Sequence, residues 1–566
     1  MIAHAVRRVA PKGDARIWTF ASVAVALLVL APVVALIAIA AQGSGDLWPH
    51  LARYVLPQSV RDTAILLAGV GVIVVTVGVG TAWLVSACRF PGRGLFDWAL
   101  LLPLAVPTYI VAFAYLDVLH PLGPVQTAVR AVLGIEDVRG FSLPEIRSLW
   151  GACLLLGLVL YPYVYLSARA LFLMQSASML EAARTLGASG ASTFFRVALP
   201  LARPAIVIGT TLALLEALND IGASEFLGVR TLTVSIYSTW LNRSSLPGAA
   251  QIALVMLAAV IALVLLERWA RRRQRFAGHA RRTHPPSPVP LSGLAAFGAI
   301  LACATPILLG FVVPSLYLAS AAWTRVALFG LSPRILIETG NTVGFALIAT
   351  IVTLALGLVL AYAVRLDRGG LATTAARIAS LGYAIPGTVL AVGLLTPLAG
   401  FDNMMDGIMR QLFGISTGLM LAGSGAALVI AYATRFLAIS GGGIEAGFTK
   451  IPASIDGAAR SLGQTAAGTV WRVHLPMLAP ALGAAAILVF VDCMKELPAT
   501  LLLRPIGFET LATHIYAEAS RGTYEDGAVA ALLIVLVGLG PVVLLARMSR
   551  PMLVLSGRSD SSSRAS

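Results

Sequence analysis

Long runs of apolar residues constrain this chain more than any other feature of its sequence. Runs of about 18–25 such residues recur along the chain, and a helix of about 20 residues crosses a hydrocarbon core about 30 Å thick. Only 12% of the 566 residues are charged, about half the share that a soluble domain carries. Because lipid offers loops and open sheet edges no hydrogen-bonding partner, the runs predict an all-α membrane protein.

We predict twelve membrane-spanning helices. Their approximate ranges are 18–41, 63–87, 98–119, 149–172, 204–222 and 248–267, then 292–318, 342–364, 378–399, 418–440, 478–494 and 528–547. The first run is longer than the apolar core of a cleaved signal peptide, so we expect it to be retained as a helix. An even number of spans places both termini on the same side of the membrane.

The loops between the spans differ in charge, and this difference predicts the orientation. Basic residues gather at the N-terminus, in the linker after the sixth span and in alternate loops; this set includes Arg89, Arg93, Arg169, Arg365, Arg435 and Arg472. The loops at 120–148, 223–247, 319–341, 400–417 and 495–527 carry fewer Arg and more Asp and Glu. The positive-inside rule therefore predicts that both termini are cytoplasmic. Without interleaved aromatic residues, the net charge of +15 does not indicate a nucleic-acid partner.

Two stretches of the chain repeat each other in the same order. Residues 181–187 and 457–463 match at an offset of 276, and the match continues to Pro200 and Pro476. Other matches have an offset of 279: Thr63 with Thr342, Pro107 with Pro386, Thr231 with Thr510, and Tyr237 with Tyr516. Each copy contains six predicted spans, so both copies insert the same way up, as a parallel repeat about an axis along the membrane normal.

The repeat predicts how the chain is divided. We expect a cytoplasmic N-terminus at 1–17, a first six-helix repeat at 18–267, a basic and Pro-rich cytoplasmic linker at 268–291, a second repeat at 292–547 and a cytoplasmic tail at 548–566. In each repeat one cytoplasmic loop carries the strongest match, at 176–203 and at 445–477.

These two loops have the pattern of a short amphipathic helix followed by a turn. Residues 181–184 favour a helix, Gly187 can end it in a left-handed cap, and Pro200 marks the return into the membrane. One such loop is equally consistent with docking to a soluble partner and with packing on the membrane surface. Two copies at matched positions favour docking to a two-fold partner.

The paired loops resemble the EAA loop of ATP-binding-cassette (ABC) importer permeases. The fused arrangement of two halves, together with Tyr161-Pro-Tyr and the segment from Met494 to Pro505, resembles the ferric-iron branch of that family. The resemblance implies the type I importer fold, also called MetI-like, in the bacterial inner membrane. It also implies a homodimer of cytoplasmic ATPase subunits, which uses ATP and Mg²⁺, and a periplasmic substrate-binding protein; this chain itself would bind no cofactor.

By resemblance, the loop helices dock in the ATPase. The residues that inherit this role are Glu181, Ala182, Ala183, Gly187 and Pro200 in the first loop and Ala458, Ala459, Gly463 and Pro476 in the second. The second loop departs from the pattern, because Gly457 occupies the acidic position and Asp456 precedes it. Either Asp456 takes over the acidic role or the second loop docks more weakly, and we expect the two loops to be unequal.

Ionisable residues inside spans are costly, so they suggest function. The fifth span ends with Glu216, Asn219 and Asp220, and the eleventh ends with Asp492, Lys495 and Glu496, at the same offset of 276. The four-residue spacing of Glu216 and Asp220 would place them on one helix face. We predict that both clusters line or gate the outer part of a translocation pathway; the alternative is structural, with Lys495 pairing to Asp492 or Glu496.

No pattern in the sequence indicates an enzyme. There is no phosphate-binding GxxxxGK[ST] loop, and the seven histidines lack paired ligand spacing, so we predict no metal site and interpret His474 as a loop contact. The expected function is therefore a permease subunit with ferric iron as the favoured cargo and thiamine or a phosphonate as alternatives. An ion-coupled secondary transporter would also fit twelve spans in a parallel repeat, but such a carrier needs no docking loop for an ATPase.

Overall fold

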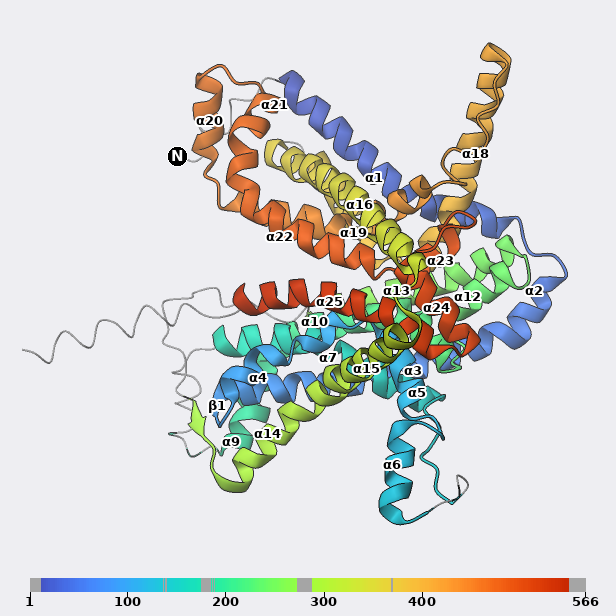
Figure 1. Cartoon of the computed structure of the whole chain (residues 1–566). Coiled ribbons are helices and arrows are strands. Elements are labelled where there is room, and N and C mark those ends of the chain that lie inside the picture. The colour runs from blue at the N-terminus through green and yellow to red at the C-terminus, as the bar shows by residue number, and fades with distance from the viewer. Residues whose placement is uncertain are drawn as a thin grey trace, which may run out of the picture.

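The computed structural model describes residues 12–135, 137, 140–174, 185, 187, 189–271, 288–367 and 370–548. Within these ranges the chain is almost entirely helical (Figure 1). The two short strands, β1 (Cys88–Arg89) and β2 (Val289–Pro290), pair in parallel and join the end of the second span to the start of the second half.

Eleven helical segments of the described residues are long and apolar enough to cross a membrane, or twelve if one bent pair counts as a single span. In the first half their helices are α1 (Lys12–Ala41), α3 (Leu56–Ala87), α7 (Leu149–Met174), α10 (Leu199–Asn219) and α13 (Leu246–Arg271). In the second half they are α14 (Gly293–Ile307) with α15 (Val313–Phe329), α16 (Pro333–Leu366), α18 (Gly387–Phe413), α19 (Gly425–Thr449), α22 (Leu475–Met494) and α25 (Tyr524–Met548).

The prediction of one continuous span at 98–119 is wrong. The structure has α4 (Arg93–Ala99), the 3-10 turn η4 (Leu102–Ala105) and α5 (Thr108–Val118), with a bend of 90° before α5. Pro107 explains the bend, because a proline forces the residue before it out of the helical region, and Val106 is extended. The second half breaks in the same way before Pro386, after α17 (Leu371–Ala379) and η7 (Ser380–Ala384).

In the described part of the chain, four helices begin directly after a π-helical turn. The turns are η3 (Leu51–Val55), η5 (Phe194–Ala198), η6 (Leu308–Val312) and η8 (Val470–His474). Each turn precedes a helix whose second residue is proline, namely Pro57, Pro200, Pro314 or Pro476. Since proline has no N–H and its ring crowds the preceding turn, the wider turn accommodates it without ending the helix.

Hydrogen bonds confirm that the two halves repeat each other. Thr63 Oγ1 accepts the backbone N–H of Leu232 at 3.0 Å, and Thr342 Oγ1 accepts that of Leu511 at 2.9 Å. Both acceptors lie on a span, and both donors lie on the first residue of a short helix, α12 (Leu232–Leu241) or α24 (Leu511–Arg521). These two helices are capped by the matched residues Thr231 and Thr510.

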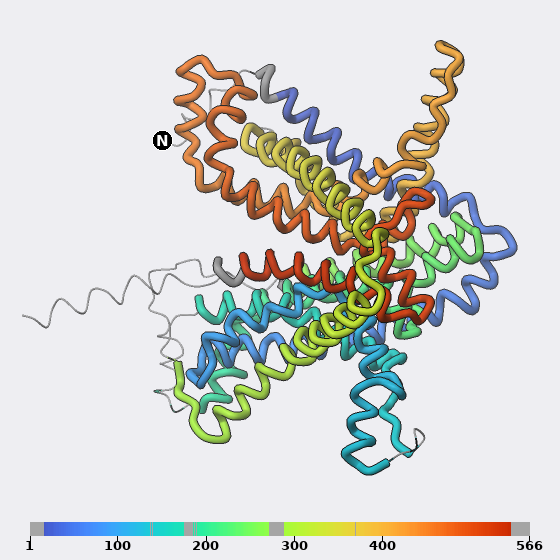
Figure 2. The backbone as a smooth tube through the Cα atoms, viewed as in Figure 1, coloured from blue at the N-terminus to red at the C-terminus, as the bar shows by residue number. Residues whose placement is uncertain are grey.

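The two halves exchange their first helices. Helix α1 packs against α16, α17 and α18 of the second half, while α15 packs against α5 of the first half and α14 against α3 (Figure 2). Each of the two main groups of helices therefore contains elements of both halves. If the two groups moved relative to each other, each moving body would contain helices from both sequence repeats.

The two groups converge on one side and diverge on the other (Figure 1). The diverging ends carry α9 (Gly190–Thr193) and β1 in one group and α20 (Ala453–Ser461) and α21 (Ala466–Thr469) in the other. The short helices α11 (Gly222–Phe226), α12, α23 (Pro498–Leu503) and α24 lie where the groups meet. The backbone N–H and C=O groups of these connecting segments are paired within the short helices. The segments can therefore fold back between the spans without leaving buried polar groups unpaired.

Candidate functional site

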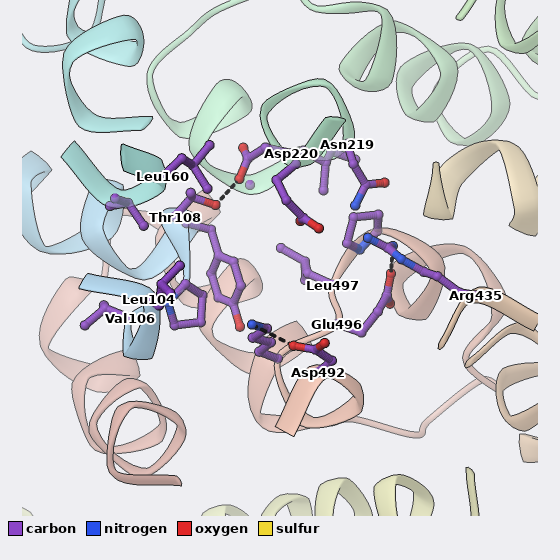
Figure 3. A pocket seen from close by; sticks show the side chains of 18 of the residues that line it. Leu104, Val106, Thr108, Leu160, Asn219, Asp220, Arg435, Asp492, Glu496 and Leu497 are labelled. Atoms are coloured by element: carbon purple, nitrogen blue, oxygen red, sulfur yellow. Dashed lines mark hydrogen bonds and ion pairs between the residues drawn. The ribbon is translucent and has the colours of Figure 1, made fainter. Parts of the chain in front are cut away.

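A cavity of about 110 Å³ lies at the point where the two groups of helices meet (Figure 3). All six ionisable or amide residues predicted for the pathway line it: Glu216, Asn219 and Asp220 from the first half, and Asp492, Lys495 and Glu496 from the second. Sequence analysis missed other polar residues that line the same cavity, namely Thr108, Tyr109, Tyr163, Tyr383 and Arg435. The structure thus brings the two predicted clusters together around one space.

Asp220 and Glu496, which are equivalent in the repeat, hold the next short helix in each half. Asp220 Oδ1 accepts the backbone N–H of Ser224 at 3.0 Å at the start of α11. Glu496 accepts the N–H groups of Ala499 and Thr500, each at 3.1 Å, at the start of α23. A carboxylate at a helix N-terminus satisfies N–H groups that have no partner within the helix.

The predicted shared helix face of Glu216 and Asp220 needs correction. Helix α10 ends at Asn219, and Asp220 follows it with an extended backbone (ψ 124°). Glu216 therefore reaches the cavity from the helix, whereas Asp220 reaches it from the turn that follows. The four-residue rule fails here because it applies only while the helix continues.

A hydrogen bond joins the two halves at the cavity, and two glycines in the cavity wall leave no room for a side chain. Asn219 Oδ1 accepts the N–H of Gly387 at 2.7 Å, which ties the end of α10 to the start of α18. A Cβ atom on Gly387 would lie 2.5 Å from Arg435 Nη1, and one on Gly222 would lie 2.5 Å from Tyr109 Cβ. Glycine at these two positions lets the connecting segments pass each other at the cavity wall.

Two ion pairs line the second-half side of the cavity. Arg435 Nη1 lies 2.8 Å from Glu496 Oε1, and the exposed fractions of these side chains are 9% and 2%. Lys495 Nζ lies 2.8 Å from Asp492 Oδ1, so the structural role considered for Lys495 is present. The assignment of Arg435 to a cytoplasmic loop is wrong, because this residue lies within α19 and faces its partner across the cavity wall.

The first-half carboxylates are held by hydroxyl groups. Tyr383 donates a hydrogen bond to Glu216 Oε1 at 2.9 Å, and Thr108 donates one to Asp220 Oδ2. In the described part of the chain neither Glu216 nor Asp220 forms an ion pair. The four carboxylates of the cavity therefore outnumber its two cationic side chains, Arg435 and Lys495. A cavity of this composition favours a positively charged solute over an anion.

The predicted coupling loops are only partly described. Glu181, Ala182 and Ala183 lie outside the described residues. Gly187 and Gly463, at matched positions, both adopt the left-handed conformation, with φ of 83° and 81°. This backbone is the one expected for a glycine that follows a helix.

Helix α20, which carries the second predicted coupling residues, is held to the rest of the protein through the side chain of Asp456. Arg365 donates to Asp456 Oδ2 through Nε at 3.0 Å and Nη2 at 2.6 Å, and His474 Nε2 lies 3.0 Å from Asp456 Oδ1. Burial alone would raise the pKa of Asp456, but His474 and Arg365 outweigh it and hold the pKa below its usual range. His474 is thus the loop contact that we expected.

The remaining residues of α20 differ in accessibility. Gly457 and Ala458 are exposed, whereas Ala459 is buried against the rest of the protein. Since Asp456 is already engaged by Arg365, the exposed surface at this position is formed by Gly457 and Ala458. In the described residues no group of three or more His, Cys, Asp or Glu side chains is arranged to hold a metal ion.

Comparison with known proteins identifies the family. The family described as "Binding-protein-dependent transport system inner membrane component" matches residues 75–276. The molybdenum transport system permease protein ModB of Escherichia coli K12 is 30% identical over 204 residues, which are 35% of this chain and 86% of that protein. The chain belongs to this family of ABC importer permeases. A permease of this family is the membrane-embedded transport subunit of the importer and not an enzyme; it works with an ATPase and a periplasmic binding protein.

Two further relatives extend the comparison. The Fe(3+)-transport system permease protein FbpB 2 of Haemophilus influenzae is 24% identical over 506 residues, which cover 88% of this permease and 90% of that protein. The sulfate transport system permease protein CysT of Escherichia coli K12 is 28% identical over 290 residues, 49% of this permease and 100% of that protein. FbpB 2 thus matches both halves, whereas CysT and ModB correspond to about half of the chain or less.

Proposed function

We propose that this permease imports ferric iron through the cavity between its two halves. The observation that carries the proposal is the composition of the cavity, in which four carboxylates and three tyrosines face two cationic side chains. Ferric iron is a hard cation, and carboxylate, phenol and water oxygens suit such ions. The cargo is a passing substrate, so a complete set of metal ligands is not required of the cavity.

The charge of the cavity favours a cationic cargo over the anionic cargoes for which some relatives are named. The relatives are described as permeases for Fe(3+), molybdenum and sulfate. An oxyanion at this position would lie beside Glu216 and Asp220, which form no ion pair among the described residues. Such an arrangement disfavours an anion through like-charge repulsion in a region of low dielectric constant. The length of the match to FbpB 2 supports iron independently.

The experiment is uptake into vesicles by the permease assembled with its ATPase and its iron-loaded binding protein. Replacing Glu216→Gln removes one negative charge and keeps the size of the side chain, so we expect slower iron uptake at normal protein level. Glu445→Gln on α19 is the matched control, because Glu445 is exposed away from the cavity. Normal uptake by Glu216→Gln would contradict the role of the cavity, and uptake of molybdate, sulfate, thiamine or a phosphonate in place of iron would contradict the cargo.

We also propose that both termini are cytoplasmic and that α20 and its partner loop at 176–203 dock on a homodimer of ATPase subunits. The basic residues near α20 and the N-terminus support this orientation. Closure of the ATPase would move the two docking loops together, and the groups of helices would then separate on the opposite side. A protease or a membrane-impermeant label applied from each side of the membrane tests the orientation, and labelling of the N-terminus from the periplasm would contradict it.

The docking loops are proposed to be unequal. Gly457 stands where the first loop has Glu181, and a Cβ atom on Gly457 would meet no atom within 4 Å. Gly457→Glu can therefore be made without disturbing the fold, and we expect it to reduce transport-coupled ATP hydrolysis. Gly457→Ala controls for loss of the glycine itself. Unchanged coupling in Gly457→Glu would contradict the asymmetry.

A further inference from the structure

Two helical arms project from the permease on opposite sides (Figure 1). The first arm is helix α6 (Pro124–Leu133), and the second arm is the C-terminal part of α18, residues 400–413. Adding the repeat offset of 279 to the range of α6 gives 403–412, so the two arms are equivalent elements of the repeat. Both lie toward the side of the molecule away from α20 and the β1–β2 pair.

Two of the three polar side chains of the first arm turn inward, and the third, Thr127, is exposed. Gln126 and Arg130 are four residues apart on one face and are only 2% and 6% exposed. Gln126 Nε2 donates to the carbonyl of Leu119 at 2.8 Å, and its Oε1 accepts the N–H of Leu143 at 3.2 Å. Arg130 Nη2 donates to the carbonyl of Pro121 at 2.7 Å. These bonds fasten the helix to the segments that lead to it and away from it.

The outer side of the first arm is apolar. Ala128 and Val132, four residues apart, are exposed, and Val132 is 87% exposed. Leu133, the last residue of the arm, and Leu122, in the turn before it, are exposed as well. A helix in water would place these apolar residues inside and the polar ones outside. The arrangement of the first arm is the reverse.

The second arm has the same arrangement with different residues. Asp402, which is fully buried, accepts the N–H groups of Leu421 and Ala422 on the returning segment, the latter at 2.8 Å. Asp406, one turn further, accepts the N–H of Thr417 at 2.8 Å. The inner face of this arm is therefore also polar and also bonded to the segment that follows it.

The outer side of the second arm carries an apolar stripe. Phe401, Met404, Ile408 and Leu412 follow one another at spacings of three and four residues and are exposed, Leu412 by 70%. Asn403 and Arg410 are also exposed, and at 100° per residue they lie on the face opposite the stripe. A helix with one apolar and one polar exposed face is suited to the boundary between lipid and water.

We propose that the two arms are anchors that lie in the surface of the bilayer, with their apolar faces in contact with the acyl chains of one leaflet. The first arm follows the buried helix α5 after the turn at 119–123, and the second arm continues the buried first part of α18, so both arms project beyond the packed helices. Contact with lipid removes apolar area from water, and it does so on opposite sides of the molecule. The anchors resist tilting of each group of helices while the groups move relative to each other.

The test measures the surroundings of single nitroxide labels on the permease in vesicles of phosphatidylethanolamine and phosphatidylglycerol. The four native cysteines, which are buried, are first replaced by alanine. A label at Leu412→Cys reports the apolar face, and a label at Asn403→Cys, which is exposed on the opposite face, reports the polar face. A label at Val132→Cys repeats the measurement on the first arm. Relaxation by oxygen, which concentrates in lipid, is compared with relaxation by a water-soluble nickel chelate.

We expect oxygen to relax the labels at Leu412 and Val132 more strongly than the nickel chelate does, with the reverse order at Asn403. Stronger relaxation by the nickel chelate at all three positions would place the arms in water and overturn the proposal. Protection of Leu412 from both agents only after addition of the periplasmic binding protein would also overturn it, by assigning the arms to that protein. Labelled variants are used only where uptake per permease matches that of the unlabelled protein, so misfolding does not enter the comparison.

Discussion

Arg435 and Glu496 form an ion pair at 2.8 Å that is almost fully buried in the wall of the cavity. The same carboxylate holds the N-terminus of α23, so one residue connects α19 to a short helix at the meeting point of the two groups. The permease thus combines a structural ion pair with the residues that we propose to conduct the cargo.

Removal of Arg435 should destabilise the protein strongly. Arg435→Leu leaves the buried Glu496 carboxylate without its cation, which typically costs about 3–5 kcal/mol of unfolding free energy. The apparent midpoint of thermal unfolding in detergent measures the effect, with Arg410→Leu as a control, because the Arg410 side chain is 62% exposed. Adding Glu496→Gln to Arg435→Leu should recover part of the loss, and no recovery would show that the charge is not the cause.

Thr63 and Thr342, which are equivalent in the repeat, should contribute similarly to the free energy of unfolding. Thr63→Val and Thr342→Val keep the shape of the side chain and leave the buried N–H of Leu232 or Leu511 without an acceptor, which costs about 1–3 kcal/mol. The same unfolding measurement checks this. Thr324→Val, at an exposed position, should change little. A large effect in only one half would contradict the equivalence of the two contacts.

His514 should make stability depend on pH near neutrality. Burial lowers the pKa of His514, but the carboxylate of Glu338, 3.0 Å from Nδ1, outweighs burial and raises it above its usual value. Glu518 and Asp526 line the same pocket and add negative charge. Because the raised pKa belongs to the folded state, the contribution is complete below the unfolded pKa of about 6.5 and is lost as pH rises through the folded value.

The measurement compares wild type with His514→Asn across this range of pH. The difference in unfolding midpoint should be largest below about pH 6.5 and should shrink as pH rises. His50→Asn, whose exposed side chain lies on α2 (Leu47–His50), is the control and should show no such trend. A difference that grows with pH would contradict the assigned direction.

Asp456 should secure α20 at neutral pH and release it in acid. Its folded pKa is lowered, so its contribution is present above the unfolded pKa of about 3.9 and is lost as pH falls through the folded value. Asp456→Asn should therefore increase hydrogen exchange in α20 at pH 7 but not below the folded pKa. If exchange in α20 were the same in both proteins at pH 7, the ion pair with Arg365 would not hold this helix.

Much of the fold could be predicted because the decisive signals are local or repeated. Apolar runs identify spans, and the constant offset of 276 is enough to pair Asp220 correctly with Glu496. The broken third span escaped prediction because hydropathy measures the transfer free energy of a segment and does not distinguish lipid from protein as its surroundings. The prolines at 107 and 386 are the local signal that could have revealed the break.

The rest of the cavity could not be found in the same way. Arg435 and Glu496 are 61 residues apart, and the repeat offers no basic partner at the position equivalent to Arg435, which is Val159. Nothing in the sequence therefore marked Arg435 as a residue of the cavity, and we predicted that it lies on the cytoplasmic side with the other basic residues. Tyr383 belongs to the 3-10 turn η7 of the second half, and only the packing of the two halves brings its hydroxyl group to Glu216.

Transport by the complete assembly tests the central claim most directly. The permease is reconstituted in vesicles that hold its ATPase and ATP inside, with the iron-loaded binding protein outside, and accumulation of radioactive iron is followed. We predict uptake only when ATP, the ATPase and the binding protein are all present. Uptake driven by an ion gradient in vesicles that lack the ATPase would contradict the account.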